Sequence, residues 1–128
     1  MPAENVGSPD PLENPLKRML REGKSVIGTT VTVASAETAA QAATLGFDFL
    51  WIEMEHSPIT LETLRNIILA TRGLKAVPIV RVPVNELWTA KRVLDVGALG
   101  VIFPFCSTPE LARQAAVRWR CENIPSRK

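Results

Sequence analysis

The chain has 128 residues, of which 46% are hydrophobic and 22% are charged, and this balance excludes a protein that is disordered throughout. Its 15 basic and 13 acidic residues give a formal net charge of +2, without the clustered basic excess that is typical of nucleic-acid-binding domains. No apolar run reaches the ~18 residues of a membrane span. We therefore expect neither nucleic acid nor a membrane as a partner.

Hydrophobic spacing and capping residues predict alternating helices and strands between a flexible leader, residues 1–10, and a divergent basic tail, residues 119–128. Ser35 and Thr60 are placed to cap helices, and a glycine follows each of the first four predicted helices. In chain order, the domain over residues 11–118 is predicted to contain a helix (Pro11–Glu22), a strand (Ser25–Val33), a helix (Ala34–Leu45), a strand (Phe47–Glu53), a helix (Leu61–Arg72), a strand (Val77–Val82), a helix (Leu87–Val96), a strand (Gly100–Phe105) and a helix (Pro109–Arg118).

The strands and the helices that follow them repeat four times, which is typical of a parallel α/β fold. The strand centres fall near Ile27, Leu50, Ile79 and Ile102, so they lie 23, 29 and 23 residues apart, as suits βαβ units. The strands are continuous apolar runs, which predicts a sheet buried on both faces. A compact, open, four-stranded parallel sheet fits this pattern. A complete eight-unit β/α barrel does not, because it needs about 200 residues or more.

Polar side chains gather where the predicted strands end. The second strand ends in Glu53–Pro58, which includes His56. Arg81 ends the third strand, and Phe103–Cys106 ends the fourth. Right-handed crossovers place the carboxyl ends of parallel strands at one edge of the sheet, where ligands of such folds bind. Arginine offers a planar, charged fork for a carboxylate or an oxyanion, and histidine can move a proton near neutral pH. The sequence therefore indicates a candidate site at this edge.

Each of these residues also has a purely structural interpretation. A lone histidine such as His56 is more often a surface or capping residue than a catalytic one. Glu53 and Glu55 can be solvated loop charges or can orient a neighbour, and Arg81 can form an ion pair with either of them. The functional hypothesis is favoured because separate strand ends supply an acid–base group, carboxylates and a guanidinium to one edge.

A histidine base needs a partner that orients its far nitrogen. Asp95, near the end of the helix over Leu87–Val96, is the candidate for this role, although its sequence position alone does not bring it within reach of His56. The alternative is that Asp95 is an exposed charge near a helix C-terminus. Trp51, in the second strand, and Trp88, in the helix after the third, are interpreted as packing residues.

The two cysteines, Cys106 and Cys121, have neither the number nor the spacing of a disulfide framework or a metal site. The first eleven residues lack the charged and then apolar order of a secretory signal. These two observations lead us to expect a cytoplasmic protein.

Two segments, GFDFLWIEMEHSPIT and VPIVRVPVNELWTAKRVLDVGALGVIFPF, resemble the HpcH/HpaI aldolase and citrate lyase family of metal-dependent 2-oxo acid aldolases. The resemblance runs from about Gly28 to about Val117 and rests on the E-H-[SA]-P loop, the arginine at a strand end and the L-D-x-G segment in combination. It implies that the chain is the N-terminal half, about four β/α units, of a TIM-type (β/α)8 barrel, truncated at its C-terminus. From about Arg118 the sequence departs from the family pattern.

The resemblance implies roles for matching positions. His56 corresponds to a histidine that transfers a proton together with a metal-bound water, and Asp95 to the acid that pairs with it. Arg81 corresponds to an arginine that binds the pyruvate or enolate oxygens. Glu55 and Pro104 fall among the substrate-binding positions. Many relatives carry aspartate where this chain has Glu53, which leaves the role of Glu53 open.

The implied reaction is the reversible aldol cleavage of 4-hydroxy-2-oxo acids to pyruvate and an aldehyde. The resemblance also implies a hexamer and a divalent metal, Mg²⁺ or Mn²⁺, whose ligands come from later strands, so that no residue here matches a metal ligand. We therefore expect negligible activity from the chain alone. The alternative is a non-catalytic α/β module that binds a small carboxylate or a partner chain.

Overall fold

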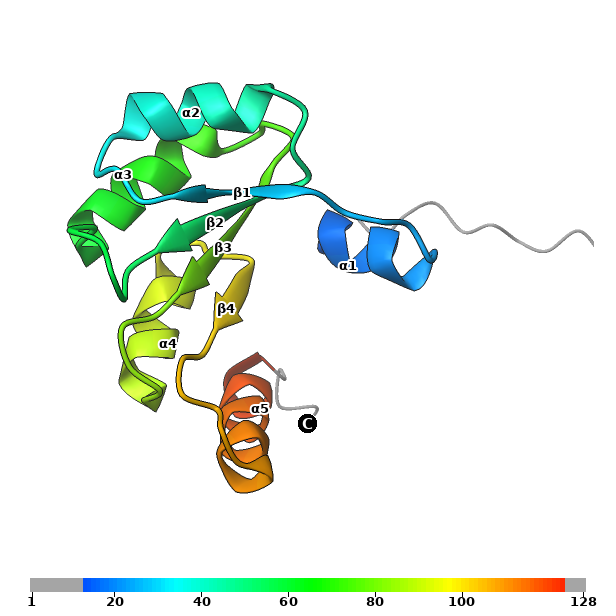
Figure 1. Ribbon diagram of the computed structural model, residues 1–128, viewed down its shortest axis with the longest axis vertical. Helices are drawn as coiled ribbons and strands as arrows, with labels where there is room; N and C mark the ends of the chain where they lie inside the picture. The colour runs from blue at the N-terminus through cyan, green and yellow to red at the C-terminus, as the bar shows by residue number, and fades with distance from the viewer. Residues whose placement is uncertain (1–12, 124–128) are drawn as a thin grey trace, which may run out of the picture.

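Four strands lie side by side in a parallel sheet, in the order β1-β2-β3-β4 (Figure 1). The computed structural model describes residues 13–123, with side chains up to residue 117. The elements are α1 (Pro15–Arg21), β1 (Gly28–Val31), α2 (Ala36–Thr44), β2 (Phe49–Glu53), α3 (Leu61–Thr71), β3 (Val77–Arg81), α4 (Leu87–Asp95), β4 (Gly100–Ile102) and α5 (Pro109–Asn123). The predicted α/β class and the order of all nine predicted elements are confirmed.

The largest differences from the predicted bounds are at the edges of the sheet and at the two ends of the chain. The strands predicted over Ser25–Val33 and Gly100–Phe105 are paired only over Gly28–Val31 and Gly100–Ile102. Each is an edge strand with one neighbouring strand among the described residues, so a single ladder of pairs defines its length. α5 continues beyond its predicted end to residue 123, which makes residues 119–123 of the predicted tail helical. The predicted leader, residues 1–10, lies outside the described residues.

Helix ends follow the capping chemistry of the sequence. The hydroxyls of Ser35, Thr60 and Thr108 accept hydrogen bonds from the N–H groups three residues later, at 3.2, 3.2 and 3.3 Å. Just after the C-terminal end of α4, Gly97 has a φ of 108°, a left-handed conformation in which a residue with a side chain would be strained. A Cβ atom at this position would also lie 3.2 Å from Cγ2 of Ile68. The chain therefore turns tightly from α4 into β4.

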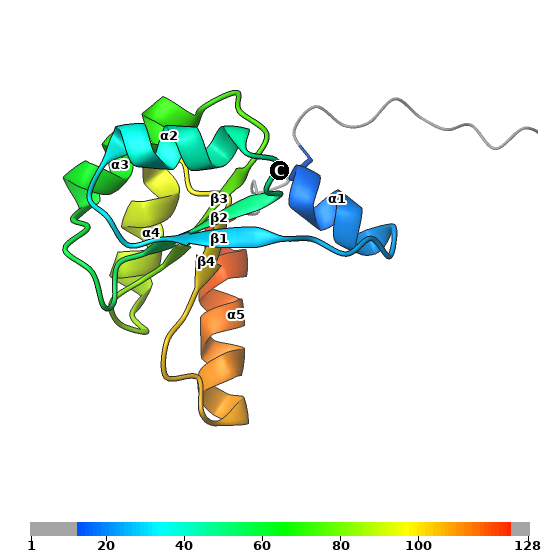
Figure 2. The same cartoon turned by 45° about the horizontal axis from the view of Figure 1, so that its top comes forward.

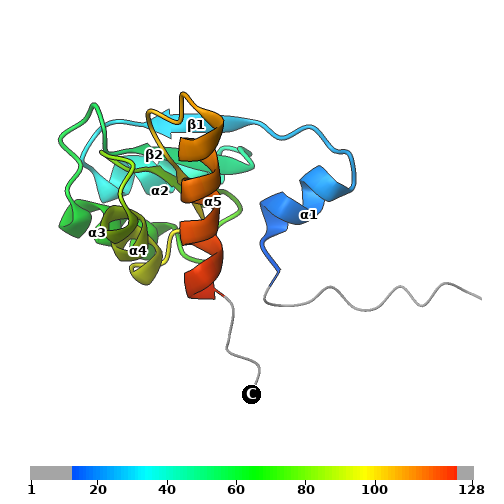
Figure 3. The same cartoon turned by 90° about the horizontal axis from the view of Figure 1, so that it is seen from below.

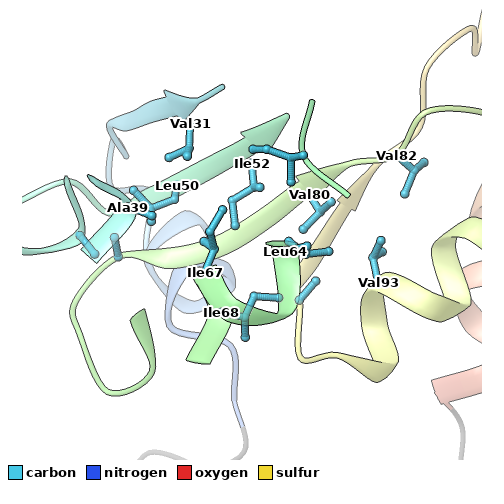
Figure 4. Packing of buried hydrophobic residues seen from close by; sticks show 14 residues of the cluster. Val31, Ala39, Leu50, Ile52, Leu64, Ile67, Ile68, Val80, Val82 and Val93 are labelled. Atoms are coloured by element: carbon cyan, nitrogen blue, oxygen red, sulfur yellow. The ribbon is translucent and has the colours of Figure 1, made fainter. Parts of the chain in front are cut away.

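One face of the sheet forms the hydrophobic core with the helices (Figure 4). Leu50 and Ile52 of β2 and Val80 of β3 have no exposed surface, and they pack with α3 residues that are equally buried, such as Leu64 and Ile67. Alternate residues of a strand point to opposite faces, so these side chains share one side. The core includes alanines of α2 and Val93 of α4, and Ala112 and Ala115 of α5 line a cavity with Val101 and Phe103 on this side.

The other face of the sheet is only partly buried. It carries Phe49 and Trp51 of β2, Ile79 of β3 and Ile102 of β4, and each is partly accessible to solvent. The prediction of a sheet buried on both faces is therefore wrong for the part of the chain that the structure describes. The continuous apolar run of β2 is real, but its alternate residues serve two faces, and the described helices cover one of them.

The helices follow one another around the covered face, as α3, α4 and α5 do in Figure 3, and α1 stands beyond the amino end of β1 (Figure 2). Doubly wound folds have helices on both faces and a reversal in strand order. A sequential strand order with helices on one side is the arrangement of neighbouring units in the wall of a β/α barrel. The fold therefore favours the barrel architecture over the compact open sheet.

A polar clamp ties three strands together at the amino edge. One carboxylate oxygen of Asp48 accepts a hydrogen bond from the N–H of Ile27 at 2.9 Å, and the other lies 3.1 Å from Nζ of Lys75. Lys75 Nζ also donates to the carbonyl of Gly46 at 2.7 Å. The N–H of Ile27 and the ammonium of Lys75 lower the pKa of Asp48. The clamp joins the residues that precede β1, β2 and β3, at the edge opposite the candidate site.

The buried face of α3 provides a test of this core. We expect Leu64→Ala to lower the free energy of unfolding by about 2–5 kcal/mol, because it leaves a cavity in a fully buried position. Leu69→Ala is the matched control on the same helix, since Leu69 is 45% exposed, and it should change stability by less than about 0.5 kcal/mol. Urea denaturation of the two variants measures both values, and similar losses in both would contradict the packing described above.

Candidate functional site

The candidate site is built on a cross-strand pair at the carboxyl edge of the sheet. Glu53, the last residue of β2, lies in register with Arg81, the last residue of β3. Oε2 of Glu53 accepts a hydrogen bond from Nε of Arg81 at 2.6 Å and lies 2.5 Å from its Nη2. The Glu53 side chain is 4% exposed and that of Arg81 is 27% exposed, so the pair is set into the sheet with its guanidinium nearer to solvent. Of the interpretations open for Arg81, the ion pair is the one that the structure shows.

Both carboxylate oxygens of Glu53 accept hydrogen bonds from several donors. Its Oε1 accepts hydrogen bonds from the N–H groups of Glu55, at 2.6 Å, and His56, at 3.1 Å. Its Oε2 accepts from Nε1 of Trp51 at 3.3 Å, besides the two contacts with Arg81. The hydroxyl of Ser57 donates to the carbonyl of Glu53. Glu53 is therefore no solvated loop charge; it fixes the turn that carries His56.

The electrostatics of the pair follow from this geometry. Burial favours the neutral form of Glu53, but hydrogen bonds from Arg81, His56 and Glu55, with the charge of Arg81, keep the pKa of Glu53 below its ordinary value. The same hydrogen bond and the charges of Glu53 and Glu55 raise the pKa of Arg81, against a smaller opposing effect of burial. Both groups are charged at neutral pH, so the site holds a fixed cation.

Glu55 lies between the arginine and the histidine. Its Oε2 is 3.2 Å from Nε of Arg81, and its Oε1 is 3.5 Å from Nε2 of His56. The Glu55 side chain is 9% exposed, whereas that of His56 is 73% exposed. The structure thus brings Glu53, Glu55, His56 and Arg81 together as predicted, with an imidazole that is open to solvent.

Asp95 is not brought to His56 within the chain. Asp95 is the exposed last residue of α4, and a helix that follows a strand ends near the amino edge of the sheet. His56 follows β2 at the carboxyl edge. A contact between these two side chains therefore requires an Asp95 from another copy of the chain, and the carboxylate beside His56 in this structure is that of Glu55.

The loop after β4 carries the remaining predicted residue, Pro104, at the same edge of the sheet. Pro104 is buried, and the next residue, Phe105, is 72% exposed with a left-handed φ of 58°. Cys106 follows and is exposed, and its Sγ accepts a hydrogen bond from Nδ2 of Asn85 at 3.6 Å. This bond links the loop after β4 to the loop after β3, so Pro104 belongs to the loops that border the site.

The two tryptophans interpreted as packing residues differ in the structure. Trp88 is 56% exposed and its Nε1 donates to the carboxylate of Glu86, so the packing interpretation is wrong for Trp88. Trp51 lies on the open face of the sheet, with its ring centroid 5.5 Å from Cζ of Arg81. Trp51 is the site residue that sequence reasoning missed. The available signal was its position two residues before Glu53, because residues i and i+2 of a strand share a face.

The site residues do not form a metal centre. Among the described side chains, residues 13–117, no group of three or more His, Cys, Asp or Glu is arranged to hold a metal ion. The lone pairs of Glu53 are directed at Arg81, Trp51 and two backbone N–H groups, which leaves a cation no open position on that carboxylate. The residues present therefore do not fit the divalent metal that the family resemblance implies.

Comparison with known proteins agrees with the geometry. The model of the HpcH/HpaI aldolase/citrate lyase family matches residues 27–126. The chain belongs to this family. The match passes residue 118, where the sequence pattern was expected to depart from the family. A hydroxypyruvate/pyruvate aldolase of Roseobacter denitrificans is 38% identical to the chain over 106 residues.

Solved structures of family relatives share the fold. A HpcH/HpaI aldolase/citrate lyase family protein from Burkholderia cenocepacia superposes with a TM-score of 0.77 at 35% identity, over 83% of this chain and 42% of that protein. A citrate synthase superposes with a TM-score of 0.73 at 34% identity, over 78% of this chain and 41% of its own. The Roseobacter aldolase is matched over 83% of this chain and 41% of its own length.

The chain thus spans about two fifths of the length of the family relatives it matches. Its four parallel β/α units superpose on about two fifths of the solved family protein from Burkholderia cenocepacia. Among the described helices, none is long and apolar enough to cross a membrane.

The depressed pKa of Glu53 predicts how stability responds to acid. A carboxylate with a lowered folded-state pKa stabilises the fold above its unfolded-state pKa, about 4.3, and this contribution is lost as the pH falls through the lower folded value. Glu53→Gln removes that titration and leaves the other carboxylates in place.

We therefore expect the stability advantage of the wild type over Glu53→Gln to be largest at neutral pH and to shrink below about pH 4.3. Urea denaturation of both proteins at a series of pH values measures the difference. An advantage that stays constant into the acid range would show that Glu53 does not titrate as described.

Proposed function

We propose that the chain carries the carboxylate-binding and proton-transfer residues of a 2-oxo acid aldolase, which cleaves 4-hydroxy-2-oxo acids reversibly to pyruvate and an aldehyde. The observation that carries the proposal is the charged Arg81 at the carboxyl edge of the sheet, in a family whose relatives include a hydroxypyruvate/pyruvate aldolase. The proposal names no particular aldehyde, because the proteins similar to this chain carry different names, a citrate synthase among them.

Arg81 is suited to the 2-oxo acid half of the substrate. Its contacts with the two glutamates use Nε and Nη2 and leave Nη1 without a partner among the described residues. An arginine has five N–H donors in a rigid fork, so Nη1 remains able to donate to a carboxylate or an enolate oxygen. A fixed cation at the place where negative charge develops stabilises the transition state of such a cleavage.

His56 is the proposed proton-transfer group, with Glu55 beside it and Pro104 on the bordering loop as substrate-contacting residues. The solvent-accessible imidazole and the carboxylate oxygen 3.5 Å from its Nε2 support this role. Asp95 can pair with His56 only from a second copy, since the two lie at opposite edges of the sheet in one chain. We propose for this reason that the working protein is a homo-oligomer, in accord with the hexamer that the resemblance implies.

The divalent metal, Mg²⁺ or Mn²⁺, belongs to the proposal as a cofactor of the complete enzyme, where it would act as a Lewis acid on the 2-oxo acid. Because the described residues do not fit a metal, we propose that its ligands lie outside them. The cytoplasm is the proposed location. A second candidate is a module that binds a small carboxylate through the charged Arg81 without turnover.

Carboxylate binding at Arg81 can be measured directly by calorimetry with oxalate, an analogue of the pyruvate enolate. We expect Arg81→Met to weaken oxalate binding at least ~10-fold, because charge-assisted hydrogen bonds are lost. Arg72→Met is the matched control, since Arg72 is an exposed arginine at the end of α3, and it should change the affinity less than about twofold. Absence of oxalate binding by the wild type, or equal losses in both variants, would overturn the proposed role of Arg81.

Turnover tests the expected inactivity of the chain alone and the non-catalytic candidate. With Mg²⁺ or Mn²⁺ we expect negligible pyruvate release from a 4-hydroxy-2-oxo acid by this chain alone, because the described residues do not form a metal site. The Roseobacter aldolase serves as the positive control in the same assay. Pyruvate release that is abolished by His56→Ala would contradict the expected inactivity and eliminate the non-catalytic candidate.

A further inference from the structure

We infer that Trp51 is a positioning residue, which holds the guanidinium of Arg81 in the orientation that presents Nη1 to a carboxylate. The inference deepens the proposed function and rests on it for the identity of the ligand. It arises from two contacts of one side chain. The indole ring lies 5.5 Å from Cζ of Arg81, and the indole Nε1 donates to Oε2 of Glu53 at 3.3 Å.

The ion pair by itself leaves the guanidinium free to pivot. Nε and Nη2 of Arg81 both contact the same oxygen of Glu53, at 2.6 and 2.5 Å, and not one oxygen each. When two nitrogens of an arginine each donate to a different oxygen of one carboxylate, the two parallel hydrogen bonds fix the plane of the guanidinium. With a single shared oxygen, the plane can swing about that atom. Arg81 therefore needs another contact to define its orientation.

Trp51 provides this contact, and it is bound to the same Glu53 oxygen about which the guanidinium can turn. Its ring covers the guanidinium, which a cation–π interaction favours. Its N–H is anchored on the same Oε2 that Arg81 uses, so the ring cannot shift without losing that hydrogen bond. Glu55, whose Oε2 lies 3.2 Å from Nε of Arg81, approaches the guanidinium at an edge nitrogen and leaves Nη1 unengaged.

A packing role does not account for Trp51. Its neighbours in β2, Leu50 and Ile52, have no exposed surface and belong to the core between sheet and helices. Trp51 points to the opposite face because side chains alternate along a strand, and it is absent from that core. Its indole Nε1 donates to Oε2 of Glu53, the oxygen that also accepts from Arg81, and this N–H has no other partner among the described residues.

The experiment compares Trp51→Phe, which keeps a ring but loses the N–H, with Trp51→Leu, which loses both. Trp88→Phe is the matched control, because Trp88 is 56% exposed and its Nε1 donates to Glu86, away from the Glu53–Arg81 pair. Two quantities are measured on the whole chain: the oxalate affinity by calorimetry, and the ¹⁵N NMR signal of the Arg81 Nε–H group, with its rate of exchange with water. Arg81→Met identifies this signal.

We expect oxalate affinity to fall about threefold in Trp51→Phe and about tenfold in Trp51→Leu, and the Arg81 Nε–H signal to shift and exchange faster in the same order. Trp88→Phe should change neither quantity. In the Arg81→Met background, Trp51→Leu should cause no further loss of affinity. This pattern supports the inference, because a role in stability alone would not change the shift or the exchange rate of the Arg81 Nε–H signal.

An Arg81 Nε–H signal with unchanged shift and exchange in both Trp51 variants would overturn the inference, whatever happens to their stability. If Trp51→Leu does not fold, Trp51→Phe still gives both measurements. Failure of the wild type to bind oxalate would overturn the proposed function of Arg81, and the NMR comparison would still decide whether Trp51 positions this side chain.

Discussion

The buried carboxylate of Glu53 is the constraint on which the site depends. A charge that is 3% exposed is tolerated only when its lone pairs meet donors, and here the donors come from three parts of the chain. They are the guanidinium of Arg81 on the next strand, the indole of Trp51 on the same strand, and the backbone of the following turn. Satisfying one carboxylate thus holds the arginine at this edge, shapes the turn and sets the position from which the histidine starts.

The two faces of the sheet also differ in what they contribute: one forms the hydrophobic core and the other carries the site residues. The side toward the helices is filled by aliphatic residues such as Leu50 and Val80 and provides the cohesion of the fold. The other side carries Trp51 and Glu53, two residues apart on β2, and Arg81, which pairs with Glu53 on β3. The remaining residues of this side include partly exposed apolar ones. In a closed barrel this side is the interior, which is filled by layers of side chains from all strands. In such a barrel the site residues would lie at one end of that interior.

Proteins similar to this chain carry the names of different enzymes. Proteins named as a hydroxypyruvate/pyruvate aldolase and as a citrate synthase share at least a third of their residues with this chain over the matched segment. A fold supports many chemistries through changes in the residues around its site. In the proposed function, the paired Glu53 and Arg81 serve the recognition of a carboxylate, which many substrates carry. Selection of the second substrate depends on residues beyond this pair.

The sequence by itself determined the alternation of strands and helices, the caps at Ser35 and Thr60, and the gathering of Glu53, His56 and Arg81 at one edge, because these follow from local spacing and from the direction of parallel strands. It also carried the family resemblance. Only the tertiary structure decided which contacts form: register places Glu53 opposite Arg81, strand alternation turns Trp51 toward the same pair, and topology places Asp95 at the other edge from His56. Such pairings depend on the relative positions of separate strands, and local sequence patterns do not contain them.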